Sequence, residues 1–105
     1  MMTADIISIM VNRIVTKFQP TRIVLFGSQA RGDATESSDI DLLVIMNDVQ
    51  DKHQTTVAIR RLLKDMPISK DIVVSTPDEI ERLRGVVGTI SYIAAHEGKI
   101  VYERC

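Results

Sequence analysis

The chain has 105 residues, of which 45% are hydrophobic and 26% are charged, and its formal net charge is −1. This length predicts one compact domain over residues 1–105. A net charge so close to zero argues against strong nucleic-acid binding, which needs an excess of Lys and Arg. No apolar run could cross a membrane, no signal peptide is indicated, and the one cysteine, Cys105, excludes an internal disulfide. We therefore expect a cytoplasmic protein without membrane attachment.

Hydrophobic spacing predicts helices and strands in alternation along the first part of the chain. In order, we expect an amphipathic helix over residues 5–18 closed by Pro20, a buried strand over 22–26, a short helix over 29–31 before Gly32, a polar turn over 33–38, and the strongest strand over 39–46.

The second part continues this pattern. We expect a helix over residues 52–65 that ends before Pro67 and turns Val57, Leu62 and Leu63 inward, a strand over 71–75, a helix opened by a capping box over 76–79, a helix over 86–97 capped by Gly98, and an edge strand over 100–102. This order predicts an α/β fold in which helices pack on a small sheet of three to four strands. The pattern leaves the strand directions open.

Two acids, Asp39 and Asp41, open the strongest strand of the sequence. Side chains alternate across a strand, so both carboxylates project from one face while their apolar neighbours pack on the other. Like charges placed this way repel, and their desolvation costs several kcal/mol unless a cation or a proton compensates. Oxygen ligands at this spacing suit Mg²⁺, which combines one or two carboxylates with substrate phosphates. A turn with two solvated acids is the alternative.

A glycine-serine turn, Gly27-Ser28, follows the preceding strand and opens the short helix. Glycine lets the backbone approach a ligand closely, and a serine hydroxyl with helix-start amides can donate to phosphate oxygens. An ordinary strand-to-helix turn would look the same in isolation. Together with the paired acids downstream, however, the turn predicts phosphoryl or nucleotidyl transfer, where positioning and charge neutralisation supply most of the catalysis.

The pattern Gly27-Ser28, ten residues, Asp39, one residue, Asp41 resembles the signature of the DNA polymerase beta-like nucleotidyltransferase superfamily. The longer motif, Gly-Ser-Gln-Ala-Arg-Gly followed by Ser-Asp-Ile-Asp-Leu-Leu-Val, resembles that of the minimal nucleotidyltransferase branch of this superfamily. That resemblance covers nearly the whole chain and implies a small mixed sheet of the polymerase beta-like fold. It also implies that Gly27 and Ser28 bind the triphosphate of ATP, and that Asp39 and Asp41 bind Mg²⁺, with two ions in the site.

The resemblance further implies a third carboxylate at the start of the next strand, which Asp71 matches. Its implied role is to share a metal and to act as the base toward the acceptor hydroxyl. An ion pair with Lys70 or a nearby arginine is the alternative reading of this acid. For Arg31, two interpretations are equally open: a contact with a phosphate, or a salt bridge to Asp33 or Glu36.

Other polar residues do not predict a site. His53 and His96 lack partners at metal-ligand spacing and are expected at the surface. A basic group on the helix predicted over 52–65 reads as a solvated face, with docking on an acidic partner as the alternative; its members are Arg60, Arg61 and Lys64.

Members of the minimal branch are often encoded beside a helical HEPN protein, as the antitoxin of a toxin–antitoxin pair. The resemblance therefore implies transfer of AMP from ATP to a tyrosine of a HEPN toxin, which would neutralise it. A binding module that only occludes the toxin is a second hypothesis. Adenylylation of a small molecule is a third, although 105 residues leave no room for an acceptor-binding domain. A glycosyltransferase metal site is a fourth, against which Gly27-Ser28 argues.

Overall fold

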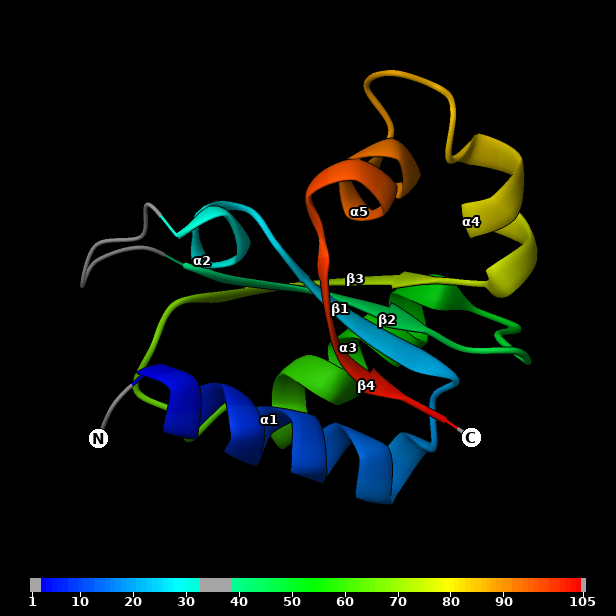
Figure 1. Cartoon of the computed structure of the whole chain (residues 1–105). Coiled ribbons are helices and arrows are strands. Elements are labelled where there is room, and N and C mark those ends of the chain that lie inside the picture. Colours follow the sequence, from blue (N-terminus) through cyan, green and yellow to red (C-terminus); the bar gives the residue numbers. More distant parts are fainter. Residues whose placement is uncertain (1–2, 33–38, 105) are drawn as a thin grey trace.

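A four-stranded β-sheet with helices on both faces forms the protein (Figure 1). The structure is a computed structural model that describes residues 3–32 and 39–104, so the polar turn predicted over residues 33–38 lies outside the described residues. None of the described helices is both long and apolar enough to span a membrane. The elements in chain order are α1 (Thr3–Phe18), β1 (Arg22–Phe26), α2 (Ser28–Arg31), β2 (Ile40–Ile45), α3 (Lys52–Leu62), β3 (Lys70–Ser75), α4 (Pro77–Leu83), α5 (Ile90–Glu97) and β4 (Lys99–Glu103).

The sheet has the strand order β3-β2-β1-β4, so β3 and β4 are its edges. Strand β1 pairs antiparallel with both β2 and β4, whereas β2 and β3 are parallel. A parallel pair needs a crossover connection, and α3 provides it between β2 and β3. The mixed sheet confirms the expected fold class and decides the strand directions that the sequence pattern leaves open.

Each face of the sheet has its own apolar core, because successive side chains of a strand point to opposite faces. Figure 1 shows α1 and α3 below the sheet and α4 and α5 above it. The core on the α1 and α3 face includes Met10, Ile14, Leu42, Ile59 and Leu63, which are all fully buried. The opposite core contains the strand residues Val24, Phe26, Leu43 and Ile45, packed under Ile80 of α4 and Ile90, Ile93 and Ala94 of α5.

The helix boundaries follow the predicted stop signals with two differences. Helix α1 ends as expected, with Gln19 in the left-handed region (φ 50°) just before Pro20. Helix α3 ends at Leu62 and not near residue 65, because the Leu63 amide donates to earlier carbonyls and tightens the last turn. Its inward face is also different: Ile59 and Leu63 are fully buried, whereas Val57 and Leu62 are only half-buried.

The two helices after β3 begin at capped residues. The Thr76 hydroxyl accepts from the Glu79 amide at 3.2 Å with Pro77 in the first turn, as the capping box predicts. The Glu79 carboxylate, however, accepts from the Ser75 hydroxyl at 3.0 Å and also pairs with Lys52. Helix α5 begins at Ile90 and not near residue 86, because the Thr89 side chain caps its first turn.

Gly98 occupies the predicted cap at the end of α5, but for a different physical reason. Its backbone is extended (φ −75°, ψ 157°), so no left-handed conformation requires a glycine here. A Cβ at this position would lie 2.4 Å from the Ala94 carbonyl oxygen and 2.6 Å from Cγ1 of Val24. The glycine therefore lets the start of β4 pass close to both α5 and β1.

We expect Gly98→Ala to lower the free energy of unfolding by about 1–3 kcal/mol, the usual cost of overpacking a site that cannot relax. The obstructing Ala94 atom is backbone and cannot rotate away. Gly85→Ala is the matched control, because a Cβ there meets no atom within 4 Å. Urea unfolding of both variants would measure the difference, and equal stabilities would show that β4 shifts freely away from α5.

Candidate active site

The predicted phosphate-binding turn lies where β1 ends and α2 begins. Gly27 adopts φ 74° and ψ −155°, a backbone conformation that residues other than glycine rarely take. Its carbonyl accepts from the amides of Ala30 and Arg31, both at 3.1 Å, which closes the turn of α2. Ser28 is then the first residue of this helix and is half-buried, at the end where helical amides point outward.

Asp41 lies directly beside this turn. A Cβ on Gly27 would come within 2.2 Å of Asp41 Oδ2, so only a glycine leaves room for the carboxylate. The antiparallel register places Asp41 opposite Phe26, the last residue of β1. Because of this pairing, the turn and the carboxylate are neighbours although 14 positions separate Gly27 from Asp41 in the sequence.

Asp71 lies on the strand on the other side of Asp41. The parallel register pairs Asp41 with Asp71, and both side chains belong to the face of the sheet that α4 and α5 cover. Side chains two positions apart on a strand share a face, and Leu43 and Val73 both pack in the core under α4 and α5. Asp41 and Asp71, two positions earlier on their strands, therefore project on that face. Asp39 precedes β2 and is exposed, whereas Asp41 is half-buried.

The charges of these acids influence each other. The pKa of Asp41 is raised, first by its burial and then by the negative charges of Asp71 and Asp39, whereas the positive charge of Arg31 opposes the rise. The carboxylates therefore share one electrostatic field, although they come from two strands and a loop. A divalent cation near Asp41 would relieve the repulsion, and the oxygen-only donor set fits Mg²⁺.

The described residues contain no group of three His, Cys, Asp or Glu side chains arranged to hold a metal ion. The three acids therefore do not form such a ligand group in this structure, and their joint role as metal ligands stays a prediction. Asp71 is engaged elsewhere: its Oδ1 accepts from Arg60 Nη2 at 2.9 Å. The physical reason is that an exposed carboxylate beside two others gains more from a cationic partner than from a third like charge.

Arg60 was not expected at the site, because the sequence pattern placed it on a solvated helix face. Eleven positions separate it from Asp71, and no local motif links the two. Lys70, the other predicted partner of Asp71, donates instead to the carbonyls of Met66 and Ile68, both at 3.1 Å. The alternative reading of Asp71, an ion pair with a nearby arginine, is thus realised through α3.

The remaining predicted site residue, Arg31, is exposed in the last turn of α2 and acts on Asp41 through its charge. Its predicted partners Asp33 and Glu36 lie outside the described residues, as does Cys105. His53 and His96 are both exposed, as expected. The His96 ring stacks on Tyr92, and its Nδ1 lies 2.9 Å from the Tyr92 carbonyl oxygen.

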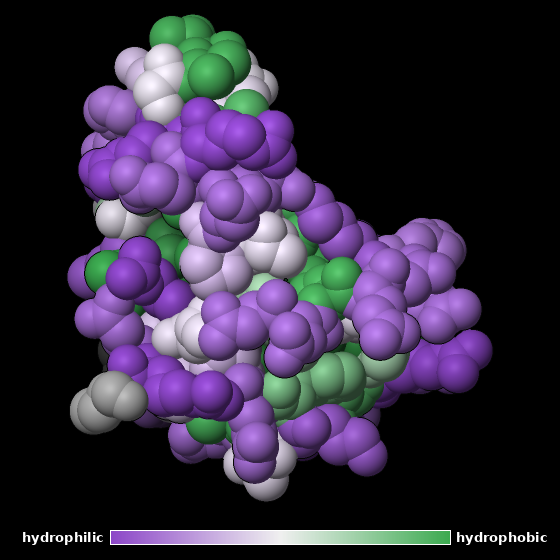
Figure 2. Space-filling view, turned by 90° about the vertical axis from the view of Figure 1, so that its right-hand side faces the viewer, coloured by the Kyte–Doolittle hydropathy of each residue, from purple (hydrophilic) through white to green (hydrophobic). Residues whose placement is uncertain are grey.

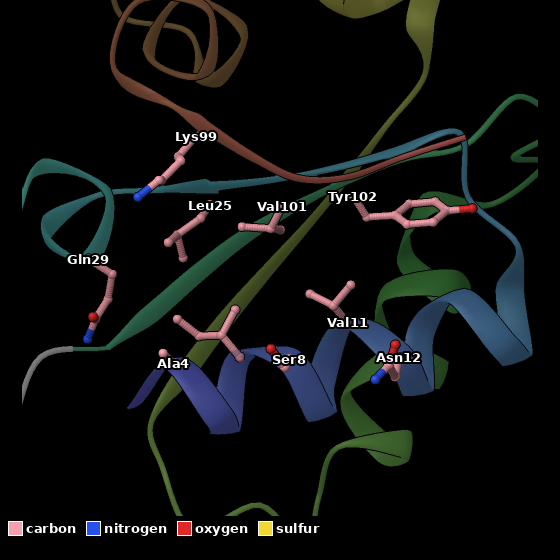
Figure 3. Close-up of a pocket in the computed structure, with 10 residues that line it drawn as sticks. Ala4, Ser8, Val11, Asn12, Leu25, Gln29, Lys99, Val101 and Tyr102 are labelled. Atoms are coloured by element: carbon pink, nitrogen blue, oxygen red, sulfur yellow. The ribbon is translucent and has the colours of Figure 1, made fainter. Parts of the chain in front are cut away.

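A groove of the described chain lies on the other face of the sheet and is separate from these acids. It has a volume of about 560 Å³ and runs between α1 and the strands β1 and β4 (Figure 3). Leu25 lines it, and Leu25 points to the face opposite Val24 and Phe26. None of the predicted site residues lines this groove, although Gln29 of α2 does.

Comparison with known proteins identifies the family of the chain. The model of the nucleotidyltransferase domain family matches residues 7–101, so the chain belongs to that family. A candidate protein adenylyltransferase of Methanocaldococcus jannaschii is 43% identical over 56 residues, which are 51% of this chain and 55% of that protein. The match thus spans about half the length of this curated relative.

Solved structures show the same fold at low sequence identity. A toxin–antitoxin structure with AMP-PNP has a TM-score of 0.69 at 20% identity, covering 98% of this chain and 75% of that chain. A mutant MntA–HpeT toxin–antitoxin structure has a TM-score of 0.68 at 18% identity, covering 92% of this chain and 73% of that chain. These likenesses establish the nucleotidyltransferase fold.

Proposed function

We propose that this chain is a Mg²⁺-dependent nucleotidyltransferase that moves AMP from ATP onto a hydroxyl of a protein partner. The observation that carries the proposal is the position of Asp41, between the Gly27 turn on one strand and Asp71 on the next. A phosphate-binding turn next to several carboxylates is the minimum set for nucleotidyl transfer. Membership of the nucleotidyltransferase family and the match to a candidate protein adenylyltransferase support the same reaction.

Each site residue has a role in this proposal. Gly27 and Ser28 bind the triphosphate through backbone amides and the serine hydroxyl, and Arg31 adds positive charge at the end of α2. Asp39, Asp41 and Asp71 hold the metal. Two Mg²⁺ ions, when bound, neutralise the charge that develops on the phosphates.

In the chemical step, the acceptor oxygen forms a bond to the α-phosphorus of ATP. The bond between that phosphorus and the bridging oxygen to the β-phosphate breaks, and pyrophosphate leaves. The hydroxyl proton passes to the Asp71 carboxylate, which lies next to Asp41 in the register. The turn at Gly27 and Ser28 holds the α-phosphate in line with the incoming oxygen, so the chain contributes mainly orientation.

The acceptor in this proposal is a tyrosine of a helical HEPN-type toxin, and the modification neutralises that toxin in the cytoplasm. The solved toxin–antitoxin structures of the same fold, one of them with AMP-PNP, support a toxin as partner. Figure 2 shows a largely hydrophilic face with an apolar tip at its top. The tip is the loop between α4 and α5, where Val86 and Val87 are 47% and 77% exposed, and adjacent exposed valines suit contact with a protein.

The test is to mix the protein with the helical product of its neighbouring gene and Mg-ATP, and to measure intact masses. We expect the partner to gain mass in steps of one adenylyl group and to lose its toxicity in parallel. The Asp39→Asn, Asp41→Asn double variant should stop both changes, because it removes two metal-binding charges and keeps the side-chain shape.

Two outcomes would instead establish occlusion as the mechanism. One is full neutralisation of the partner by the double variant at stoichiometric dose. The other is tight binding of both forms with no change in mass. A mass gain on a small-molecule acceptor, with none on the partner, would move the proposal to a different substrate class.

A further inference from the structure

The ion pair between Arg60 and Asp71 is placed where stability gains little from it. Arg60 Nη2 donates to Asp71 Oδ1 at 2.9 Å, and the two side chains are 53% and 54% exposed. Exposed pairs of this kind contribute little to folding because water and salt screen them. The feature that matters for the site is therefore the place of the pair, on an acid of the proposed metal site, and not its contribution to stability.

The fold directs Arg60 to this carboxylate. Ile59 and Leu63 are fully buried in the core under the sheet and fix the rotation of α3 about its axis. Asp71 belongs to β3, which is an edge strand, and projects on the face opposite α3. A long arginine side chain can reach this carboxylate around the open edge of the sheet without crossing it.

The contact concerns one of the acids that the metal would need. Asp71 is the register partner of Asp41, and its negative charge acts on Asp41. An arginine side chain carries a fixed positive charge in proteins. A divalent cation approaching Asp71 must therefore compete with Arg60 for the carboxylate and also approach a fixed positive charge.

We propose that Arg60 is a positioning residue that occupies Asp71 as a competing cation, so that divalent metal enters the site together with the nucleotide. The metal alone binds weakly because it must displace the guanidinium. Metal that arrives with the triphosphate is held by phosphate oxygens as well, and the phosphates offset the positive charge of Arg60. This inference rests on the proposed function, and it assigns to Arg60 the control of whether metal binds alone or together with the nucleotide.

The test measures binding of Mn²⁺ alone, as a spectroscopic probe for Mg²⁺, and of Mg-ATP, using the whole chain. Arg60→Gln should bind free Mn²⁺ about three- to tenfold more tightly than the unmodified protein, since the substitution removes a positive charge that contacts Asp71. Its affinity for Mg-ATP should rise by less than that. Arg60→Lys keeps the charge and should behave like the unmodified protein.

Arg61→Gln is the matched control, because it removes the same charge one position along α3, where the described residues give it no ion pair. It should change Mn²⁺ affinity less than about twofold. Equal tightening in Arg60→Gln and Arg61→Gln would reduce the effect to net charge and overturn the inference. Unchanged or weaker Mn²⁺ binding in Arg60→Gln would overturn it as well. If the unmodified protein binds neither Mn²⁺ nor Mg-ATP, the proposed function itself fails, whatever the variants do.

Discussion

The Asp39→Asn, Asp41→Asn double variant is expected to lose the whole Mg²⁺-dependent part of the rise in Tm that ATP causes. A ligand that binds the folded state stabilises it by mass action, and at a hundredfold excess over Kd the gain is about 2.7 kcal/mol. Without these two carboxylates only Asp71 of the three proposed metal ligands remains, so the metal-dependent gain should disappear. Thermal unfolding with ATP, with and without Mg²⁺, measures this directly.

The same variant should be at least as stable as the unmodified protein when neither ATP nor Mg²⁺ is added. The raised pKa of Asp41 shows that its charged form is disfavoured in the folded protein. A folded-state pKa above the unfolded one lowers the free energy of unfolding as the pH rises through the interval between the two values. Asparagine carries no charge, so the variant escapes this penalty at neutral pH.

A control pair, Asp48→Asn with Asp78→Asn, removes the same number of carboxylates from exposed positions, one in the loop after β2 and one in the first turn of α4. It should keep the full response to Mg-ATP. If the site variant and the control pair respond alike, nucleotide binding does not depend on Asp39 and Asp41, and the proposed metal site is wrong.

Gly27→Ala is expected to be the most damaging single substitution at the site. The new Cβ would lie 2.2 Å from Asp41 Oδ2 and 3.2 Å from its Cγ, and the backbone at φ 74° is strained for any other residue. Backbone strain and overpacking together cost about 2–4 kcal/mol. In a domain of this size that corresponds to a fall in Tm of about 10 °C or more. Because the substitution displaces Asp41, the variant protein should also lose the rise in Tm that Mg-ATP causes.

Gly32→Ala separates the two causes. Gly32 also has a positive φ, of 84°, but a Cβ there meets no atom within 4 Å. It should therefore cost only the backbone term, about 1 kcal/mol. Should Gly27→Ala be no worse than Gly32→Ala in thermal unfolding, the close approach of the turn to Asp41 has no energetic consequence.

Much of the fold follows from local patterns in the sequence. The helix ending before Pro20, the strands over 22–26 and 71–75, and the Thr76 cap all lie where spacing and capping residues place them. These features depend on neighbours within a few positions, which a sequence displays directly. The boundaries that differ, at the end of α3 and the start of α5, depend on which residues the core buries and on the cap at Thr89.

The residues of the candidate site are also predicted by short motifs, namely Gly27-Ser28 and the alternating pair Asp39 and Asp41. From local pattern alone one obtains the class of fold, the glycine-serine turn after β1 and the two acids at the start of β2. Three features become visible only in the folded chain: β2 and β3 run parallel, Asp41 lies against Gly27, and Arg60 pairs with Asp71. Each of these joins elements distant in sequence, and their register and separation arise from the packing of whole helices and strands, which no local pattern encodes.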